Sequence, residues 1–525
     1  PGLFDQIKAR VAEGRWEPGG GMWIEPDVNC VSGESLVRQI LHGERWWRSR
    51  FGDKGRQRFL YLPDTFGFGS NLPQIMQLAG LDTFITNKLH WSATNRFPHT
   101  TFVWQGIDGS EVLGHNTPSA DYNAVNTPKE LRRGEKNYRE TTPETLAIDE
   151  RSRWLQPFGY GDGGGGATDW SIRFAEFSTR CEGLPRVKLS TASAFCDELA
   201  RDRVHLQACG KDFPFVRGEL YLELHRGTLT TQGWIKKANR RAEESLRLAE
   251  LLLVGGPRAA SEPVRERAAL DEAWKLVLLN QFHDILPGSS IWQVYADNNA
   301  DHAEVQRIGQ EVRDTATAAL LAADDRPPTT DHQDAAVASP SSMVVLNSLP
   351  WPRSEPVLLP LADSAAVPEG AQAVDNVDGT RALLLEATVP SYGYAPLAGT
   401  ERVHEAMLMV SKTSLENAEL RLELDENGEI ARLYDKIAGR ELLVAGAPAN
   451  QLVAYEDRPM KWDAWDIDIF YEDRTEKVEC VHSIKITEQG PLRVALDIKR
   501  EYRNSRIRQT IYLYHDSKRI DFDTW

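Results

Sequence analysis

The chain has 525 residues, of which 41% are apolar and 26% are charged. This length predicts about two to four domains, and the composition is that of a globular protein with no apolar run long enough to span a membrane. The 61 basic and 77 acidic residues give a net charge of −16, which argues against nucleic acid or an anionic membrane as partner and fits a neutral substrate. The five cysteines lack a CxxC pair, which favours free thiols in a reducing compartment.

The first 130 residues alternate predicted helices and strands. A helix is expected near the start of the chain, over residues 3–14, and a second over Ser35–Phe51, opened by Ser32. Between these helices lies a strand and loop that carries two acids, Glu25 and Asp27, beside a tryptophan. This alternation is typical of βαβ units.

Asp64 lies in a predicted strand–loop–helix–strand unit on which the rest of the prediction depends. Phe59–Leu62 is an unbroken apolar run, as expected of a strand buried on both faces of a parallel sheet. A glycine-rich loop, a helix over Leu72–Ala79 and a strand over Asp82–Leu89 follow. Such a unit places Asp64 at the carboxyl end of a strand, where sheets and barrels of this kind hold their chemistry. Capping of the loop explains the same residue without any function.

A second lone acid, Asp162, lies in a second glycine-rich turn, Gly161–Gly166, which follows a predicted strand over Trp154–Tyr160. Four consecutive glycines allow the backbone to approach a ligand closely. A phosphate loop is the alternative, but no Gly-Lys-Ser/Thr follows it. Earlier in the chain, Asp108-Gly109 between two apolar runs predicts a β-hairpin.

Gly218–Gly227 alternates like a strand and ends in the polar pair His225 and Arg226, for which a solvated strand end is the simpler explanation. After this segment the apolar residues recur with the period of an α-helix, which predicts a three-helix bundle. Its helices are expected over Gln232–Val254, Arg265–Gln281 and Trp292–Leu321, with a break at Asp297–Asn299.

His283 lies between the second and third of these helices, directly before Asp284. A histidine at a helix end more often fills the core or caps the helix than binds a ligand. The neighbouring acid at the edge of a bundle favours metal binding more than an isolated histidine would.

The last third of the chain is predicted to be a β-sandwich. Residues 322–342 are rich in Pro, Thr, Asp and Ala, which predicts a linker. Alternating segments follow, with Asn427-Gly428 as a hairpin turn. The dense acids and aromatics of Trp462–Tyr471 suggest a loop that reaches the active site, and a salt-bridged strand edge is the alternative.

Taken together and in this order, the motifs resemble the glycoside hydrolase family 38 α-mannosidases. The resemblance is carried by residues 20–27, 32–36, 62–67, 159–166, 225–228, 281–288 and 462–471. Any one of these motifs alone is weak evidence for the family, whereas the complete set in this order is specific to it. The GDGGGG form and the absence of paired cysteines are more similar to the cytosolic and bacterial branch, so a cytoplasmic protein is expected.

The resemblance implies a multidomain α/β architecture. Its parts would be an incomplete seven-stranded β/α barrel over residues 1–230, a three-helix bundle over 231–321, the linker over 322–342 and a truncated β-sandwich over 343–525. The implied activity is a retaining, exo-acting hydrolysis of terminal α-linked mannose, assisted by one Zn²⁺. An oligosaccharide would be the partner, with no nucleic acid or membrane, and a homo-oligomer is left open.

The same resemblance implies roles for individual residues. Asp64 would be the nucleophile and a zinc ligand, His283 a second zinc ligand and Asp162 the acid/base. Retention requires two carboxyl groups roughly 5–5.5 Å apart, one ionised and one protonated. Further contacts to the sugar are expected from a larger set: Glu25, Asp27, His225, Arg226, Asp284, Asp463, Trp465 and Asp466.

One departure from the family pattern affects the metal. The family's first barrel strand carries a His-x-Asp pair that supplies two more zinc ligands, and this sequence is expected to begin after it. Asp64 and His283 alone fall below the three protein ligands usual for catalytic zinc. The 525 residues by themselves are therefore expected to bind zinc weakly and to be inactive.

Two other functions remain open from the sequence. A metal-dependent polysaccharide deacetylase also uses Asp and His ligands on a distorted barrel, but it predicts a His-x-x-x-His pair that is not found. A carbohydrate-binding protein without catalysis would use some of the fifteen tryptophans to stack on sugars.

Overall fold

In the computed structural model, the described residues are 2–119, 121–142, 152–255, 264–322, 344–362, 366–375, 379–397 and 408–525. The chain divides into two compact units, one of Pro1–Ala323 with Arg458–Asp468 and one of Asp324–Asp457 with Ile469–Trp525. The chain is therefore a multidomain α/β protein with several sheets. Most of the predicted linker, 322–342, lies outside the described residues.

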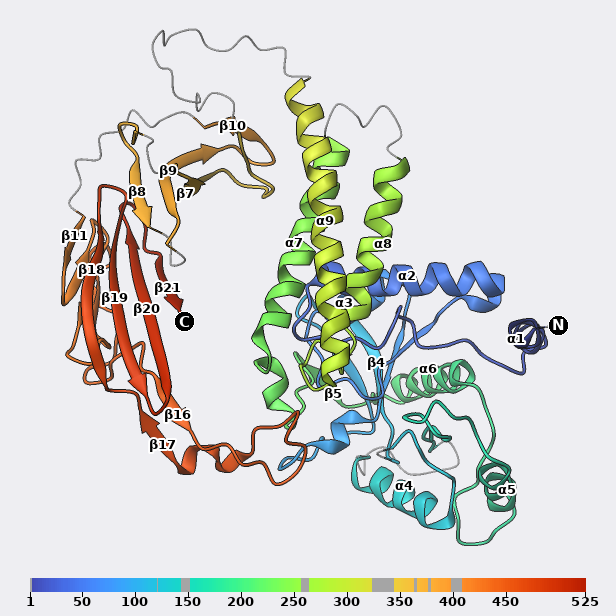
Figure 1. The fold of residues 1–525 in the computed structure, drawn as a ribbon. Coiled ribbons are helices and arrows are strands. Elements are labelled where there is room, and N and C mark those ends of the chain that lie inside the picture. The colour runs from blue at the N-terminus through green and yellow to red at the C-terminus, as the bar shows by residue number, and fades with distance from the viewer. Residues whose placement is uncertain are drawn as a thin grey trace. The chain divides into compact units, whose positions relative to one another are not determined.

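A five-stranded sheet forms the centre of the first unit, in the order β1-β2-β4-β3-β5 (Figure 1). Only the β3–β4 pair is antiparallel. That pair is the hairpin predicted at Asp108-Gly109, which is confirmed. The strands are β1 (Phe59–Tyr61), β2 (Thr83–Thr86), β3 (Thr101–Gln105), β4 (Glu111–Asn116) and β5 (Phe215–Arg217).

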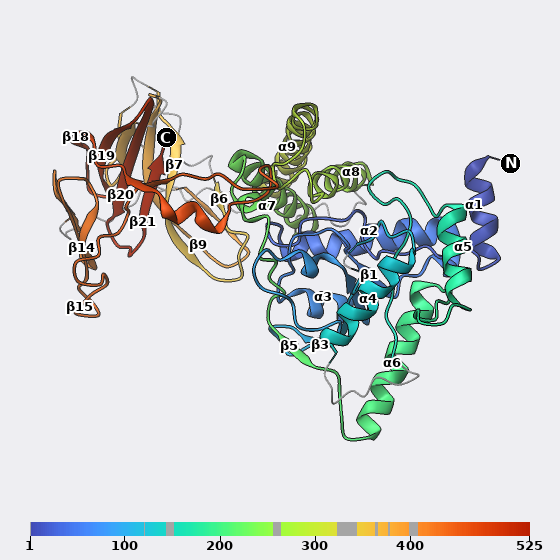
Figure 2. The same ribbon diagram turned by 90° about the horizontal axis from the view of Figure 1, so that it is seen from below.

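Helices cover both faces of this sheet (Figure 2). Leu60 of β1 and Phe84 of β2 lie in one core with residues of α2 and α3, whereas Phe59 and Ile85 face Cys196 of α6. Neighbouring strand residues thus point to opposite faces, and both sets are apolar because both faces are buried. The helices are α1 (Leu3–Ala12), α2 (Gly33–Phe51), α3 (Leu72–Leu78), α4 (Pro128–Glu140), α5 (Asp169–Ser178) and α6 (Ala192–Ala208), with short 3₁₀ turns η1 (Gly52–Gly55), η2 (Lys88–Trp91) and η3 (Arg226–Leu229).

Two predicted strands of this unit are wrong. Trp154–Tyr160 forms only isolated bridges, at Phe158 and Tyr160, because the glycine-rich turn folds back on Tyr160 itself. Gly218–Gly227 forms one bridge, at Leu220, and ends where His225 takes a left-handed conformation (φ 61°). The described residues therefore show a five-stranded mixed sheet, and the seven-stranded barrel stays a prediction.

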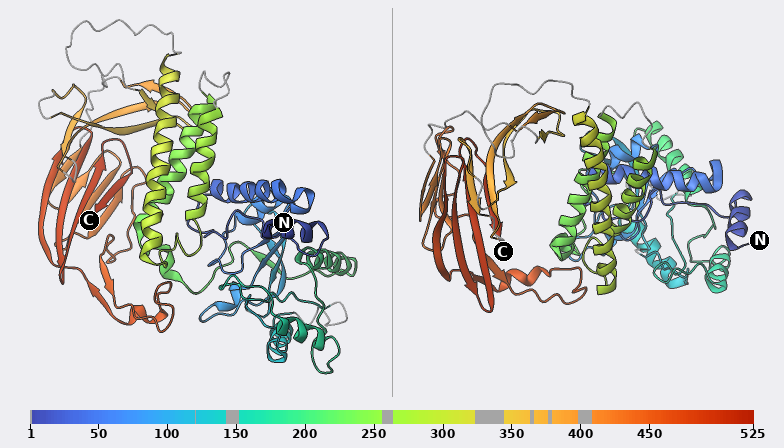
Figure 3. Two further views of the ribbon diagram at one scale, coloured as in Figure 1. Left: turned by 45° about the vertical axis from the view of Figure 1, so that its right-hand side comes forward. Right: turned by 45° about the horizontal axis from the view of Figure 1, so that its top comes forward.

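Three long helices follow the sheet and run side by side (Figures 1 and 3). Their facing apolar side chains, including Leu246, Trp274 and Val305, form a single buried cluster. The predicted break at Asp297–Asn299 is wrong, since Asn298 is fully buried and donates to the Asn280 side chain (2.8 Å) from within a continuous helix. The helices are α7 (Gly233–Gly255), α8 (Val264–Asn280) and α9 (Trp292–Ala322). None of the helices in the described ranges is long and apolar enough to cross a bilayer.

The second unit contains the β-rich part of the chain. A five-stranded sheet, β11-β12-β13-β14-β15, and a four-stranded sheet, β18-β19-β20-β21, share one apolar core, to which Leu422 and Leu496 belong. The strands of these two sheets are β11 (Met409–Ser411), β12 (Ser414–Glu416), β13 (Leu420–Leu424), β14 (Ile430–Asp435), β15 (Arg440–Glu441), β18 (Val481–Gln489), β19 (Arg493–Tyr502), β20 (Ser505–Tyr514) and β21 (Ile520–Thr524).

Three smaller sheets complete this unit, in the orders β7-β9-β8, β10-β6 and β16-β17. Their strands are β6 (Val344–Leu346), β7 (Arg353–Pro360), β8 (Gln372–Asp375), β9 (Arg381–Val389), β10 (Tyr394–Pro396), β16 (Val453–Tyr455) and β17 (Thr475–Lys477), with the turn η6 (Ile469–Asp473).

Candidate active site

Asp64 and His283 lie in one site of the first unit, with His283 Nε2 3.6 Å from Asp64 Oδ2. One backbone pairing brings the segment of His283 to this site. Asp64 follows β1, and the segment at Pro26 bridges to Phe282, so that the His283 amide donates to the Glu25 carbonyl (3.2 Å). The loop after α8 is thereby fixed beside the carboxyl end of β1.

Lys88 forms the closest contact of the Asp64 carboxylate, through a short ion pair of its Nζ with Oδ1. The lysine side chain is 5% exposed and the Asp64 side chain 22% exposed, so the charge of Asp64 is open to a ligand while that of Lys88 is not. Burial would raise the pKa of Asp64, but hydrogen bonding from His283 and the charge of Lys88 outweigh it and lower that pKa to about 2. Asp64 is therefore an ionised carboxylate at neutral pH.

Glu25 forms hydrogen bonds to the segments of both Asp64 and His283. Its Oε1 accepts hydrogen bonds from the amides of Asp64 (2.5 Å) and Thr65 (3.0 Å), and burial raises its pKa. Its backbone carbonyl accepts from His283 Nδ1 (2.9 Å). Glu25 thus fixes the backbone at Asp64 and the ring orientation of His283 at the same time.

His283 Nε2 also faces Asp284, whose Oδ2 lies 3.7 Å away. Burial would lower the pKa of His283, but hydrogen bonding to Asp64 and the charges of Glu25 and Asp284 raise it to about 9. The site is therefore built to hold positive charge between acids. Asp284 Oδ1 in turn accepts from the indole of Trp465 (3.2 Å).

The donor set has the chemistry that a divalent cation requires: one imidazole nitrogen and the carboxylates of Asp64 and Asp284. A histidine whose Nδ1 is bound to a carbonyl presents Nε2 as the ligand atom, as His283 does here. Within the described ranges, no three His, Cys, Asp or Glu side chains are already arranged as a metal site. The residues therefore fit a divalent cation by the type of their donor atoms, and the bound metal remains a prediction.

Tyr122 connects Asp162 to the site of Asp64. The Tyr122 hydroxyl donates to Asp162 Oδ1 (2.8 Å) and the Asn123 amide donates to Oδ2 (3.0 Å). Burial, the charge of Asp64 and the hydrogen bond to Asp162 all raise the pKa of Tyr122. A single phenol thus interacts with both predicted catalytic acids, Asp64 and Asp162.

The segment Arg458–Asp468 belongs to this unit although it lies among the strands of the second in sequence. Trp465 reaches Asp284, and Asp466 accepts from the Arg226 amide (3.4 Å). Asp463 is exposed and forms no hydrogen bond or ion pair with the described residues.

The other two predicted sugar contacts are buried. His225 packs edge-on against Phe66 (ring centroids 4.6 Å apart), and burial with the charge of Lys88 lowers its pKa to about 3. Asp27 is 2% exposed, and its Oδ1 accepts from the amides of Asn29 and Cys30. The side chain of Asp27 thus stabilises the turn that follows it.

Sequence reasoning missed Lys88, Tyr122 and Asn123. Lys88 could be found only with the strand register known: Tyr61 of β1 pairs with Ile85 of β2, and Asp64 and Lys88 each lie three residues further on. An acid and a base at equivalent places on adjacent parallel strands should meet. Tyr122 lies in an irregular segment, where no periodicity could place it.

Three domain models match successive parts of the chain. They are the Glycosyl hydrolases family 38 N-terminal domain over residues 1–219, the Alpha mannosidase middle domain over 223–320 and the Glycosyl hydrolases family 38 C-terminal domain over 415–525.

Curated relatives match almost the whole chain. Alpha-mannosidase 2C1 of Homo sapiens is 34% identical over 524 residues, which are 98% of this chain and 46% of the relative. Alpha-mannosidase G of Dictyostelium discoideum is 32% identical, over 100% of this chain and 49% of the relative. The chain thus spans about half the length of these relatives.

The fold is similar to that of solved structures. An alpha-mannosidase from Enterococcus faecalis V583 superposes with a TM-score of 0.69 at 18% identity, over 99% of this chain and 66% of that one.

Proposed function

The chain belongs to glycoside hydrolase family 38, and we propose that the protein is a retaining, exo-acting α-mannosidase. It would remove terminal α-linked mannose from oligosaccharides through a covalent glycosyl-aspartate at Asp64. The observation that carries the proposal is the convergence of Asp64, Lys88 and His283 at the carboxyl end of β1.

In the first step, Asp64 would attack the anomeric carbon. The buried ammonium of Lys88 and the imidazole of His283 keep this carboxylate ionised, and the bonds from the Asp64 and Thr65 amides to Glu25 hold its backbone still. A nucleophile fixed in place loses little entropy on reaching the transition state.

Asp162 would protonate the leaving oxygen and then deprotonate the attacking water. The hydrogen bonds that its two carboxyl oxygens accept from Tyr122 and Asn123 fix the orientation of this group. In the first step Asp162 must carry a proton, and the Tyr122 hydroxyl can accept from the protonated carboxyl group by rotating, whereas the Asn123 amide nitrogen can only donate.

His283, Asp64 and Asp284 would hold the metal. A Zn²⁺ bound there would supply positive charge beside Asp64 and a template for vicinal sugar hydroxyls. Glu25 would keep the His283 ring oriented through its carbonyl, and Trp465 would do the same for Asp284. His225, Arg226, Asp463 and Asp466 complete the proposed sugar contacts.

The stereochemistry of the product tests this proposal. Proton NMR of a chromogenic α-mannoside during hydrolysis by the full-length protein is expected to detect α-mannose first, because two inversions at one carbon restore its configuration. The β anomer follows only by mutarotation. Initial appearance of β-mannose would contradict a glycosyl-aspartate intermediate.

A further inference from the structure

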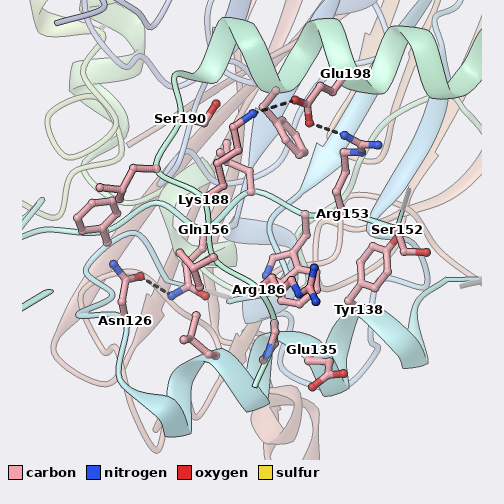
Figure 4. Close-up of a pocket in the computed structure, with 18 of the residues that line it drawn as sticks. Asn126, Glu135, Tyr138, Ser152, Arg153, Gln156, Arg186, Lys188, Ser190 and Glu198 are labelled. Carbon is pink, nitrogen blue, oxygen red and sulfur yellow. Dashed lines mark hydrogen bonds and ion pairs between the residues drawn. The ribbon is translucent and has the colours of Figure 1, made fainter. Parts of the chain in front are cut away.

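A cavity of about 550 Å³ lies in the first unit between α4, residues 152–158 and residues 185–190 (Figure 4). Neither Asp64 nor His283 lines it, and the mechanism above makes no use of it. Its volume is in the range of pockets that bind small molecules. Two of its polar groups, one buried and one exposed, have no protein partner among the described residues.

The first of these groups is the side-chain carbonyl of Gln156. The Gln156 amide nitrogen donates to Asn126 Oδ1 (2.7 Å), and the amide of Asn126 donates to the Ser171 carbonyl (3.4 Å), so the orientation of Gln156 is fixed. Gln156 Oε1 is buried and accepts no hydrogen bond from the described residues. Such an acceptor calls for an O–H or N–H donor.

The second group is the guanidinium of Arg186. The other cations lining the cavity are paired: Arg153 with Glu198, Arg139 with Glu135 (2.8 Å) and Lys188 with Glu198 (3.5 Å). Arg186 is exposed at the edge of the cavity and forms no hydrogen bond or ion pair with any residue in the described ranges. A free guanidinium at a cavity is suited to bind phosphate or carboxylate in two-point fashion.

Aromatic side chains provide the apolar part of the wall. Tyr138 of α4 and Trp154 stack with ring centroids 5.3 Å apart and planes 28° apart, and Phe158 lines the same cavity. A wall of this kind next to hydrogen-bonding groups suits a ligand with an apolar face and a polar edge, such as a sugar ring.

We propose that this cavity binds an anionic monosaccharide, a sugar phosphate or a sugar acid. Its anionic group would pair with Arg186, and one of its hydroxyls would donate to Gln156 Oε1. A bare anion does not supply that donor, and a neutral sugar leaves Arg186 without a counter-charge. The proposal does not depend on the activity assigned to Asp64.

Calorimetric titration of the protein with mannose 6-phosphate and with glucuronate tests the proposal. Saturable binding of at least one of these probes is expected. Arg186→Gln should weaken it by about tenfold, as expected for loss of a charge-assisted bond. Arg180→Gln removes the same charge from an exposed position outside the cavity and should leave binding unchanged.

Gln156→Met, checked for an unchanged melting temperature, should weaken binding of the sugar probes in the same way. Equal affinity for inorganic phosphate and mannose 6-phosphate would contradict the role of the sugar hydroxyl. Binding that survives Arg186→Gln unchanged, or no saturable binding of either probe up to about 10 mM, would overturn the proposal.

Discussion

Replacing Asp64 with asparagine is expected to lower kcat/KM for a chromogenic α-mannoside by at least about 10⁴-fold in the full-length protein. The wild-type carboxylate, with a pKa of about 2, is ionised and can form a glycosyl ester. The amide of asparagine is a far poorer nucleophile. Initial rates at several substrate concentrations measure the loss.

Loss of the Asp64 charge also leaves Lys88 buried without its counter-ion, and this alone could destabilise the protein. The double variant Asp64→Asn with Lys88→Met removes both charges. It is expected to recover the melting temperature and to stay inactive. Recovery of activity in the double variant would show that the single variant merely misfolds.

A matched control separates the site from a general effect of losing an acid. Asp314→Asn makes the same change at an exposed position of α9, where the acid accepts from Gln310 (2.6 Å), and should retain full activity. Retention of mannoside binding by Asp64→Asn would further support a glycosidase. Unchanged behaviour of Asp64→Asn would favour a carbohydrate-binding protein.

Replacing His283 with alanine is expected to reduce zinc affinity by at least about 100-fold, and activity with it. Residues that only orient a metal ligand typically contribute 10–100-fold, so a direct ligand should contribute at least as much. Nε2 of His283 is the proposed ligand atom that faces both Asp64 and Asp284. Zinc content of the full-length protein after dialysis, measured by elemental analysis, reports the loss.

The control for this variant is His205→Ala, at an exposed position of α6, which should leave zinc content unchanged. Added Zn²⁺ is expected to restore part of the activity of His283→Ala, because the carboxylates of Asp64 and Asp284 remain. Full zinc content in His283→Ala would contradict a metal ligand at this position.

The sequence was most informative where burial is complete. Phe59–Leu62 could be predicted because a strand buried on both faces reads as an unbroken apolar run. The position of Asp64 directly after β1 followed from this pattern. The strand after α3 was predicted over Asp82–Leu89 and is shorter, Thr83–Thr86, because a 3₁₀ turn begins at Lys88. The three long helices could be predicted because each presents a continuous apolar face.

The errors fell where a local backbone conformation or a buried side-chain pair overrides the sequence pattern. His225 takes a left-handed conformation and ends the extended segment before it, which composition does not reveal. The turn at Gly161–Gly166 folds back on Tyr160, so an apolar run before it makes isolated bridges instead of a strand. In α9, a buried amide pair between Asn298 and Asn280 keeps a polar stretch helical.

The candidate site could be predicted only in part, because its residues come from distant segments. Asp64 and His283 are 219 positions apart in the sequence, and the pairing of Pro26 with Phe282 that joins their segments carries no sequence pattern. Tyr122 was missed because irregular backbone has no period. Lys88 was missed because register between parallel strands has to be known before adjacent side chains can be paired.

The most direct measurement is the identity of the residue that carries the sugar during turnover. A fluorinated mannosyl fluoride slows hydrolysis of the intermediate, so the full-length protein should accumulate a covalent adduct. Peptide mass spectrometry is expected to locate that adduct on Asp64 and to find none in Asp64→Asn. An adduct on another residue, or turnover without any adduct, would contradict the assignment of Asp64 as nucleophile.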